Sequence, residues 1–206
     1  MRAVFIFVVI IILIVLAVPA TFAVRFWMDG SAVLARAERS GALRAADSGR
    51  LNLVERTVAM SEFRGTWRTH ATPCRTLAFL WYDLTDQGAP EGVSVSQKVA
   101  TTLLTENRGT SVRWQIRRFI VACQLEQRFN DRQLLRMWLG RVSFGQGVEG
   151  VEAASQAVFG KPSRELNAEE SARLTALLRA PSLRSQPERW AERAQLIQES
   201  VAAPAH

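Results

Sequence analysis

Residues 131–181 read DRQLLRMWLGRVSFGQGVEGVEAASQAVFGKPSRELNAEESARLTALLRAP. This stretch predicts three helices separated by short connections. The first is capped by Asn130 or Asp131 and ends at Gly140. Three glycines stand within residues 145–150, which indicates tight turns with little room for side chains.

The second predicted helix, near residues 151–159, is small and apolar, so a neighbouring backbone can approach it closely. The third opens at Asn167, an N-cap with Glu170 at the third helical position, and stops before Pro181. Apolar residues at helical spacing predict earlier helices at about 51–63, 73–82, 95–104 and 112–129. Because no strand pattern follows the amino-terminal segment, we expect an all-α fold.

In the helix predicted at 112–129, a helical projection places Arg117, Gln124 and Arg128 on one polar arc. We expect this arc to face solvent. Arg118 and Glu126 interrupt the apolar remainder, where charges need partners or a polar cleft.

Four motifs of the 131–181 stretch match one family in residue type and spacing. They are Trp138-Leu139-Gly140, Phe144-Gly145-Gln146-Gly147, Gly150-Val151-Glu152-Ala153-Ala154 and Phe159-Gly160-Lys161. Over roughly residues 51–200 the chain thus resembles the peptidoglycan glycosyltransferase domain (glycosyltransferase family 51) of bifunctional penicillin-binding proteins and monofunctional biosynthetic transglycosylases. It departs from the family at Gly140, where the family has Asn.

The resemblance implies an all-α, lysozyme-like fold that engages lipid II or undecaprenyl-pyrophosphate-linked glycan. The family joins a lipid-pyrophosphate-linked glycan to the 4-hydroxyl of a lipid-linked disaccharide. Such inverting transfer needs a carboxylate that takes the acceptor proton and cations that stabilise the departing pyrophosphate.

Both carboxylates that the family uses are replaced when the sequences are aligned without gaps. Ser61 stands at the position of the base, and a slip of one residue would place Glu62 there. Glu62 is therefore the candidate catalytic residue, with a solvated carboxylate at a helix end as the alternative. Arg118 stands at the second catalytic Glu, so the expected ligand of the family's divalent metal is missing. We expect no metal site and no certain cofactor, and enzymatic activity is left open.

The resemblance also implies substrate-binding residues. They are Ser96, Gln97 and Lys98 of the family's second motif, Arg117 and Arg118 of the third, and Lys161 of the Phe-Gly-Lys motif. Three of these have structural alternatives: Gln97 as the capping-box partner of Ser94, Lys161 as a C-terminal helix cap, and Arg118 as the ion-pair partner of Glu55 or Glu62.

The segment Ala3 to Phe22 is almost purely apolar and long enough to span a bilayer. We expect a retained transmembrane helix, with a signal peptide cleaved after Ala23 as the alternative. The predicted layout is an anchor at 1–24, a linker with a short surface helix at 25–50, a glycosyltransferase-like domain at 51–200 and a tail at 201–206. We expect a single-pass protein of the inner (cytoplasmic) membrane with its domain in the periplasm.

The formal charge of +7 suits anionic partners, although a solvated surface is the alternative. We expect the membrane and lipid pyrophosphates as partners, and no nucleic acid. Cys74 and Cys123 would meet an oxidising compartment, and the sequence leaves open a disulfide or two buried thiols.

The first functional hypothesis is a membrane-anchored glycosyltransferase homologue in cell-wall assembly whose catalysis is doubtful. The second is a non-catalytic scaffold that docks on cell-wall synthases. Hydrolysis of glycan, a third, would need one carboxylate of raised pKa, and Glu62 is the candidate.

Overall fold

The computed structural model describes residues 2–43, 49–67, 74, 93–104 and 111–203, with the backbone alone for residues 2–16, 18, 19 and 65. Its α-helices are α1 Arg2–Arg39, α2 Leu53–Glu62, α4 Val95–Leu103, α5 Val112–Arg128, α6 Asp131–Leu139, α7 Val151–Phe159, α8 Ala168–Arg179 and α9 Pro187–Ala202. Three short 3-10 helices are η1 Arg64–Thr66, η2 Ser163–Glu165 and η3 Pro181–Ser185. Within these residues the only β feature is an isolated bridge between Ser143 and Glu149, which confirms the all-α prediction. The helix predicted at 73–82 lies outside the described residues, Cys74 excepted.

Helix ends follow the local signals of the sequence. Asn130 caps α6 in a capping box with Gln133, and Asn167 caps α8 in a capping box with Glu170, as predicted for α8. Gly160 ends α7 in the left-handed conformation with a φ of 70°. The three helices of the 131–181 stretch are therefore confirmed.

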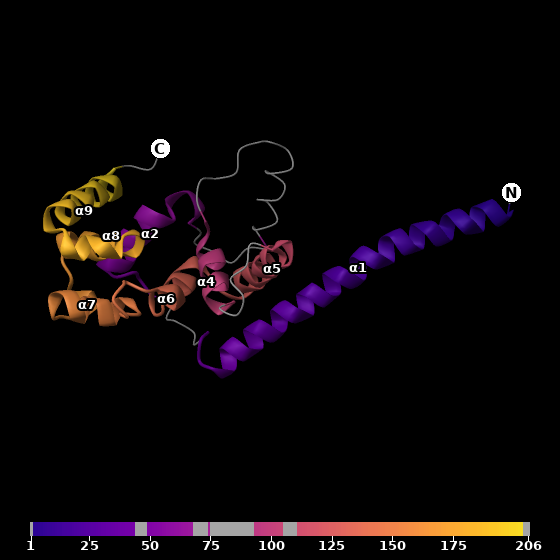
Figure 1. Cartoon of the computed structure of the whole chain (residues 1–206), viewed down its shortest axis with the longest axis horizontal. Helices are drawn as coiled ribbons and strands as arrows, with labels where there is room; N and C mark the ends of the chain where they lie inside the picture. Colours follow the sequence, from indigo (N-terminus) through magenta and orange to yellow (C-terminus); the bar gives the residue numbers. More distant parts are fainter. Residues whose placement is uncertain (1, 44–48, 68–73, 75–92, 105–110, 204–206) are drawn as a thin grey trace.

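Helix α2 connects two hydrophobic clusters. Val58 and Phe63 belong to the cluster shared with α1, α4, α5 and α6, where the Phe63 ring meets Trp138 edge to face at 5.5 Å. Val54 belongs to the second cluster, built with α8, α9 and Phe144. In Figure 1, α7, α8 and α9 accordingly lie at the end of the body opposite to α1.

Two glycines of the 145–150 loop are required by their surroundings. Gly145 has a φ of +87°, and a Cβ there would lie 2.4 Å from the Cβ of Pro181. Gly150 has a φ of +86°, and a Cβ there would lie 2.8 Å from the carbonyl oxygen of Gly140. The loop is as tight as the glycine spacing predicts.

Helix α1 continues without a break to Arg39, so the part of the expected linker over residues 25–39 is helical (Figure 1). It packs along α5, and this contact corrects the prediction of a solvent-facing arc. Gln124 is only 3% exposed, because its amide donates to the backbone oxygen of Trp27 and to the hydroxyl of Ser31. The prediction is therefore wrong for Gln124, whereas Arg128 stays exposed while it pairs with Glu38 of α1 at 2.7 Å.

Among the residues whose side chains are described, no helix is long and apolar enough to cross a membrane. The segment Ala3 to Phe22 lies entirely within α1.

Candidate functional site

The family's second motif lies at the start of α4, where Ser96 is used internally. Its hydroxyl donates to Glu126 of α5 at 2.7 Å and lies 2.8 Å from the hydroxyl of Ser94. Ser96 and Glu126 are both fully buried. In this structure the hydroxyl of Ser96 therefore joins α4 to α5 and does not reach the surface.

The two following residues of α4 are half-buried. The hydroxyl of Ser94 accepts from the backbone N–H of Gln97 at 3.4 Å, so Ser94 is the N-cap of α4. The second bond of a capping box, from the backbone N–H of Ser94 to the side chain of Gln97, is not formed. The side-chain amide of Gln97 therefore does not cap the helix. The ammonium of Lys98 lies 5.8 Å from the ring centroid of Trp138, within cation–π range.

Arg118 stands on α5 next to Trp114, one turn earlier. Its guanidinium carbon lies 5.3 Å from the ring centroid of Trp114, and its Nε is buried without a hydrogen-bond partner among the described groups. Burial lowers the pKa of Arg118, because desolvation disfavours the charged form, although arginine stays protonated in proteins. Trp114 was not singled out in the sequence, although its spacing of four residues from Arg118 was the available signal.

The carboxylates that we considered as partners of Arg118 are occupied elsewhere. Glu55 accepts from Arg136 at 2.9 and 3.1 Å, and Glu62 pairs with Arg179 at 2.6 Å. The alternative in which Arg118 pairs with either of them is therefore wrong for this structure.

Glu62 lies at the end of α2 and points toward α8. Together with Ser61, Arg179 and Arg193, it lines a cavity of about 150 Å³ between α2, α8 and α9. The Glu62 side chain is 10% exposed, against 56% for Arg179. Glu62 is thus neither fully solvated nor free of a counter-charge.

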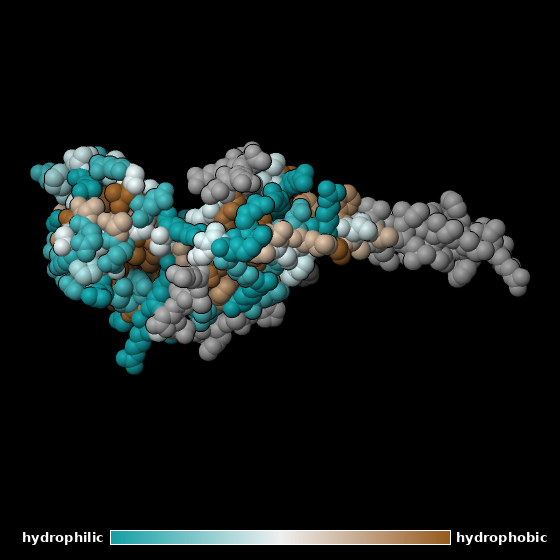
Figure 2. Space-filling model, turned by 90° about the horizontal axis from the view of Figure 1, so that it is seen from below, coloured by the Kyte–Doolittle hydropathy of each residue, from teal (hydrophilic) through white to brown (hydrophobic). Residues whose placement is uncertain are grey.

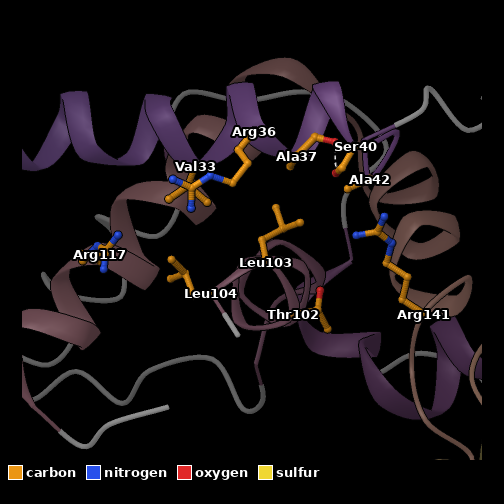
Figure 3. Close-up of a pocket in the computed structure, with 10 residues that line it drawn as sticks. All are labelled: Val33, Arg36, Ala37, Ser40, Ala42, Thr102, Leu103, Leu104, Arg117 and Arg141. Atoms are coloured by element: carbon orange, nitrogen blue, oxygen red, sulfur yellow. Dashed lines mark hydrogen bonds between the residues drawn. The ribbon is translucent and has the colours of Figure 1, made fainter. Parts of the chain in front are cut away.

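The remaining predicted site residues lie apart from the Arg118 side chain. Lys161 pairs with Glu170 in the first turn of α8 at 2.7 Å. Arg117 points in a different direction from Arg118, because successive helix residues point about 100° apart. Arg117 lines a cavity between α1, α4 and α5 (Figure 3). The described structure thus brings Gln97, Lys98 and Arg118 to neighbouring helices, and it places Lys161 and Glu62 beside α8.

A divalent metal does not fit the described residues. They contain no group of three or more His, Cys, Asp or Glu side chains able to hold an ion, and a cation, Arg118, stands where the resemblance places the expected metal ligand.

Cys74 and Cys123 form a disulfide, with their Cα atoms 4.5 Å apart. Of the two alternatives that the sequence left open, the structure therefore shows the disulfide. The bond ties residue 74 to the buried centre of α5.

The described residues form an all-α domain. The model of the Transglycosylase family matches residues 58–202, and the chain therefore belongs to this family and carries a peptidoglycan glycosyltransferase domain.

Named relatives agree with this family. The chain is 36% identical to penicillin-binding protein 1C of Escherichia coli K12 over 121 residues, which are 59% of this chain and 16% of that protein. It is 33% identical to penicillin-binding protein 1A of Aquifex aeolicus over 109 residues, 52% of this chain and 15% of that protein. It is also 33% identical to the biosynthetic peptidoglycan transglycosylase of Acinetobacter baumannii ATCC 17978 over 90 residues, 44% of this chain and 40% of that protein. The matched region thus spans less than half the length of these relatives.

Proposed function

We propose that this chain is a membrane-anchored, periplasmic homologue of peptidoglycan glycosyltransferases that binds lipid-pyrophosphate-linked glycan, such as lipid II, without polymerising it. Its place would be in bacterial cell-wall assembly. Binding would involve Arg118 of α5 together with Gln97 and Lys98 of α4. Ser96 would act indirectly, by fixing α4 against α5.

The proposal rests on the surroundings of the Arg118 side chain. Its guanidinium is half-buried beside Trp114, and no carboxylate of the described residues neutralises it. An unpaired cation in such a place is costly unless a ligand supplies the counter-charge. A guanidinium fork matches the geometry of a phosphate group.

The absence of turnover is supported by the groups at the two catalytic positions. Ser61 has no carboxylate, and Arg118 reverses the charge of the second Glu. Glu62 is held by Arg179 at 2.6 Å, so its oxygen is engaged with a guanidinium and not directed at an acceptor hydroxyl. A general base must be within hydrogen-bond reach of the proton that it removes.

Membrane anchoring is supported by an apolar surface at the junction of α1 and α5, visible in Figure 2 where α1 leaves the helical body. Its large exposed side chains are Phe22 (57%), Val112 (75%) and Ile116 (38%), which line one hollow there together with Phe26. This surface continues the apolar segment of α1, and exposed apolar patches of this kind mark interaction sites. Recovery of protein that begins near Val24 from a membrane-free extract would contradict a retained anchor.

Binding is tested with the full chain in detergent and with lipid II as ligand, at two salt concentrations. Arg118→Ala should weaken binding by about 1.5–3 kcal/mol, the usual scale for a hydrogen bond to a charged group. Arg56→Ala is the matched control, because Arg56 is exposed on α2. Equal, salt-independent affinities of the wild type and Arg118→Ala would reject the phosphate site, and the scaffold hypothesis would then be preferred.

Turnover is tested separately, by following polymerisation of lipid II. We expect little or no product, because loss of a general base typically costs about 10²–10⁴-fold in rate. Robust glycan chains that disappear in Glu62→Gln would show instead that Glu62 is the base.

A further inference from the structure

The hollow between α1 and the first turn of α5 combines apolar and charged side chains. Its volume is about 330 Å³. Besides the apolar side chains named above, the residues that line it are Arg25 and Asp29 of α1 and Arg113 of α5. A surface of this composition suits an amphiphile, because the apolar side chains can cover hydrocarbon while the charged ones meet a polar head group.

None of the three charged side chains has a partner within the described part of the chain. Arg25 and Arg113 are exposed, and no ion pair or hydrogen bond engages their guanidinium groups there. Asp29 is half-buried, and its carboxylate has no hydrogen bond or ion pair among the same residues. A half-buried carboxylate without a partner is costly. A ligand that offers a cation to Asp29 and an anion to the arginines would therefore complement the hollow.

The start of α5 also favours an anion at this place. α5 has 17 residues, its N-cap is Ser111, and no acidic residue stands in its first turn. No side chain of this turn therefore compensates the positive end of the helix dipole. Because Arg113 belongs to the same turn, its charge and the dipole favour an anion together. The α5 side of the hollow thus suits a phosphate group.

We propose that this hollow binds a phospholipid whose head group carries both a phosphate and a primary ammonium, as that of phosphatidylethanolamine does. The phosphate accepts from Arg25 and Arg113, and the ammonium donates to Asp29. The acyl chains lie along the apolar side chains of the hollow. A quaternary ammonium, as in phosphatidylcholine, has no N–H to donate. A head group without a cation, as in phosphatidylglycerol, leaves the carboxylate of Asp29 unpaired.

The order of the charges along α1 agrees with this arrangement, a step that rests on the proposed membrane anchor. Arg25 follows Phe22, the end of the apolar segment, by three residues, which is about 4–5 Å along a helix. Asp29 follows Arg25 by four residues, about 6 Å further on. The head-group layer on each side of a bilayer is about 5–8 Å thick. Arg25 thus lies among the phosphates, and Asp29 lies on their water side, where the ammonium reaches it through its two-carbon linker.

The test is native mass spectrometry of the full chain, released from detergent micelles that contain equal amounts of phosphatidylethanolamine, phosphatidylglycerol and phosphatidylcholine. The wild type should retain phosphatidylethanolamine in preference to the other two lipids. Asp29→Asn, which keeps the size of the side chain, should lower the preference over phosphatidylglycerol about three- to fivefold, the scale of a partly exposed ion pair. Arg113→Gln should lower the retention of all three lipids by a similar factor, because each of them carries a phosphate.

Two exposed residues that do not line the hollow provide matched controls, Glu192 for Asp29 and Arg56 for Arg113. Glu192→Gln and Arg56→Gln should keep the lipid pattern of the wild type. A change in either control that equals the change at its counterpart would mean that net charge, and not the hollow, decides retention, and it would reject the inference.

Three further results would overturn the inference. Equal retention of the three lipids by the wild type would show apolar contact without head-group recognition. A preference for phosphatidylethanolamine that survives in Asp29→Asn would exclude the proposed role of the carboxylate. A preference for phosphatidylglycerol that Arg113→Gln removes would assign the hollow to anionic lipids.

These outcomes are distinguishable from a failure of the proposed function. A chain cleaved near Val24 would still carry Arg25, Asp29 and Arg113, so the loss of the anchor leaves the lipid measurement possible. Lipid II binding is tested through Arg118, which does not line this hollow. The two proposals therefore fail independently.

Discussion

The hydroxyl of Ser96 in α4 donates a hydrogen bond of 2.7 Å to the carboxylate of Glu126 in α5, and neither residue is exposed. A buried carboxylate is costly unless it is hydrogen-bonded. The family's second motif therefore contributes to the packing of two helices, and this role does not depend on catalysis. It gives a physical reason for the presence of this part of the motif that is independent of any catalytic residue.

Ser96→Ala should lower the free energy of unfolding by roughly 1–3 kcal/mol, because Glu126 loses a hydrogen bond in the core. Urea unfolding followed by circular dichroism measures the change. Ser185→Ala is the control, since its exposed hydroxyl bonds only to the nearby backbone oxygen of Ser182. The control should stay within about 0.5 kcal/mol of the wild type. An equally small effect of Ser96→Ala would show that this bond adds nothing to stability.

Gly145 and Gly147 offer a matched pair, because both have positive φ, of +87° and +75°, but only Gly145 is crowded. Gly147→Ala should cost about 1–2 kcal/mol, the penalty of a left-handed conformation. Gly145→Ala should cost roughly 1–3 kcal/mol more, because its Cβ would overlap Pro181. Thermal unfolding of both variants gives the difference. Equal losses would mean that the loop moves away from Pro181 without cost.

The disulfide should contribute to stability through the length of the loop that it closes. Cys74 and Cys123 are 49 residues apart, for which the chain-entropy model gives about 4 kcal/mol. Reduction of the wild type should lower the urea midpoint accordingly. The double variant Cys74→Ala, Cys123→Ala should be insensitive to reductant. If the reductant leaves the wild type unchanged as well, the bond does not constrain the unfolded chain.

Helix ends were predictable from the sequence because their causes are local. Asn167 with Glu170 marks the start of α8 by itself, and Gly160 ends α7 for reasons of backbone geometry alone. The polar arc of α5 was not predictable in the same way. Helical periodicity separates polar from apolar residues, but it does not say whether water or a second helix covers the polar side. Gln124 is buried because α1 supplies its hydrogen-bond partners.

The sequence predicted which residues belong to the candidate site, but it did not predict which side chains they pair with. The motifs located Arg118 and Lys161, but the partners of such residues come from other parts of the chain. Glu62 and Arg179 are 117 residues apart, and nothing in either local sequence indicates their ion pair. The same applies to Arg36 and Arg141, which line the same cavity as Arg117 and for which an excess of arginine was the only signal.

Lys161 and Glu170 give the last prediction, a dependence of stability on pH. The ammonium of Lys161 donates to Glu170, and the backbone N–H of Asn167 adds a second bond, so the pKa of Glu170 lies below its ordinary value. A lowered pKa means that the folded state favours the ionised carboxylate. The stabilisation is therefore fully present above the unfolded-state pKa, about 4.3, and is lost as the pH falls through the folded-state pKa.

The measurement compares urea unfolding of the wild type and Glu170→Gln from pH 7 to pH 3. The wild type should be the more stable at pH 7, and the difference should shrink below about pH 4.3. Glu169→Gln is the control, because Glu169 pairs with Arg173 on the exposed side of the same helix turn. A constant difference between the wild type and Glu170→Gln over this range would contradict the lowered pKa.

Lys161→Met should raise the pKa of Glu170 toward its ordinary value in a carboxyl NMR titration. An anion that binds Lys161 must compete with Glu170, so the same titration in the presence of lipid pyrophosphate would show whether Lys161 leaves its partner.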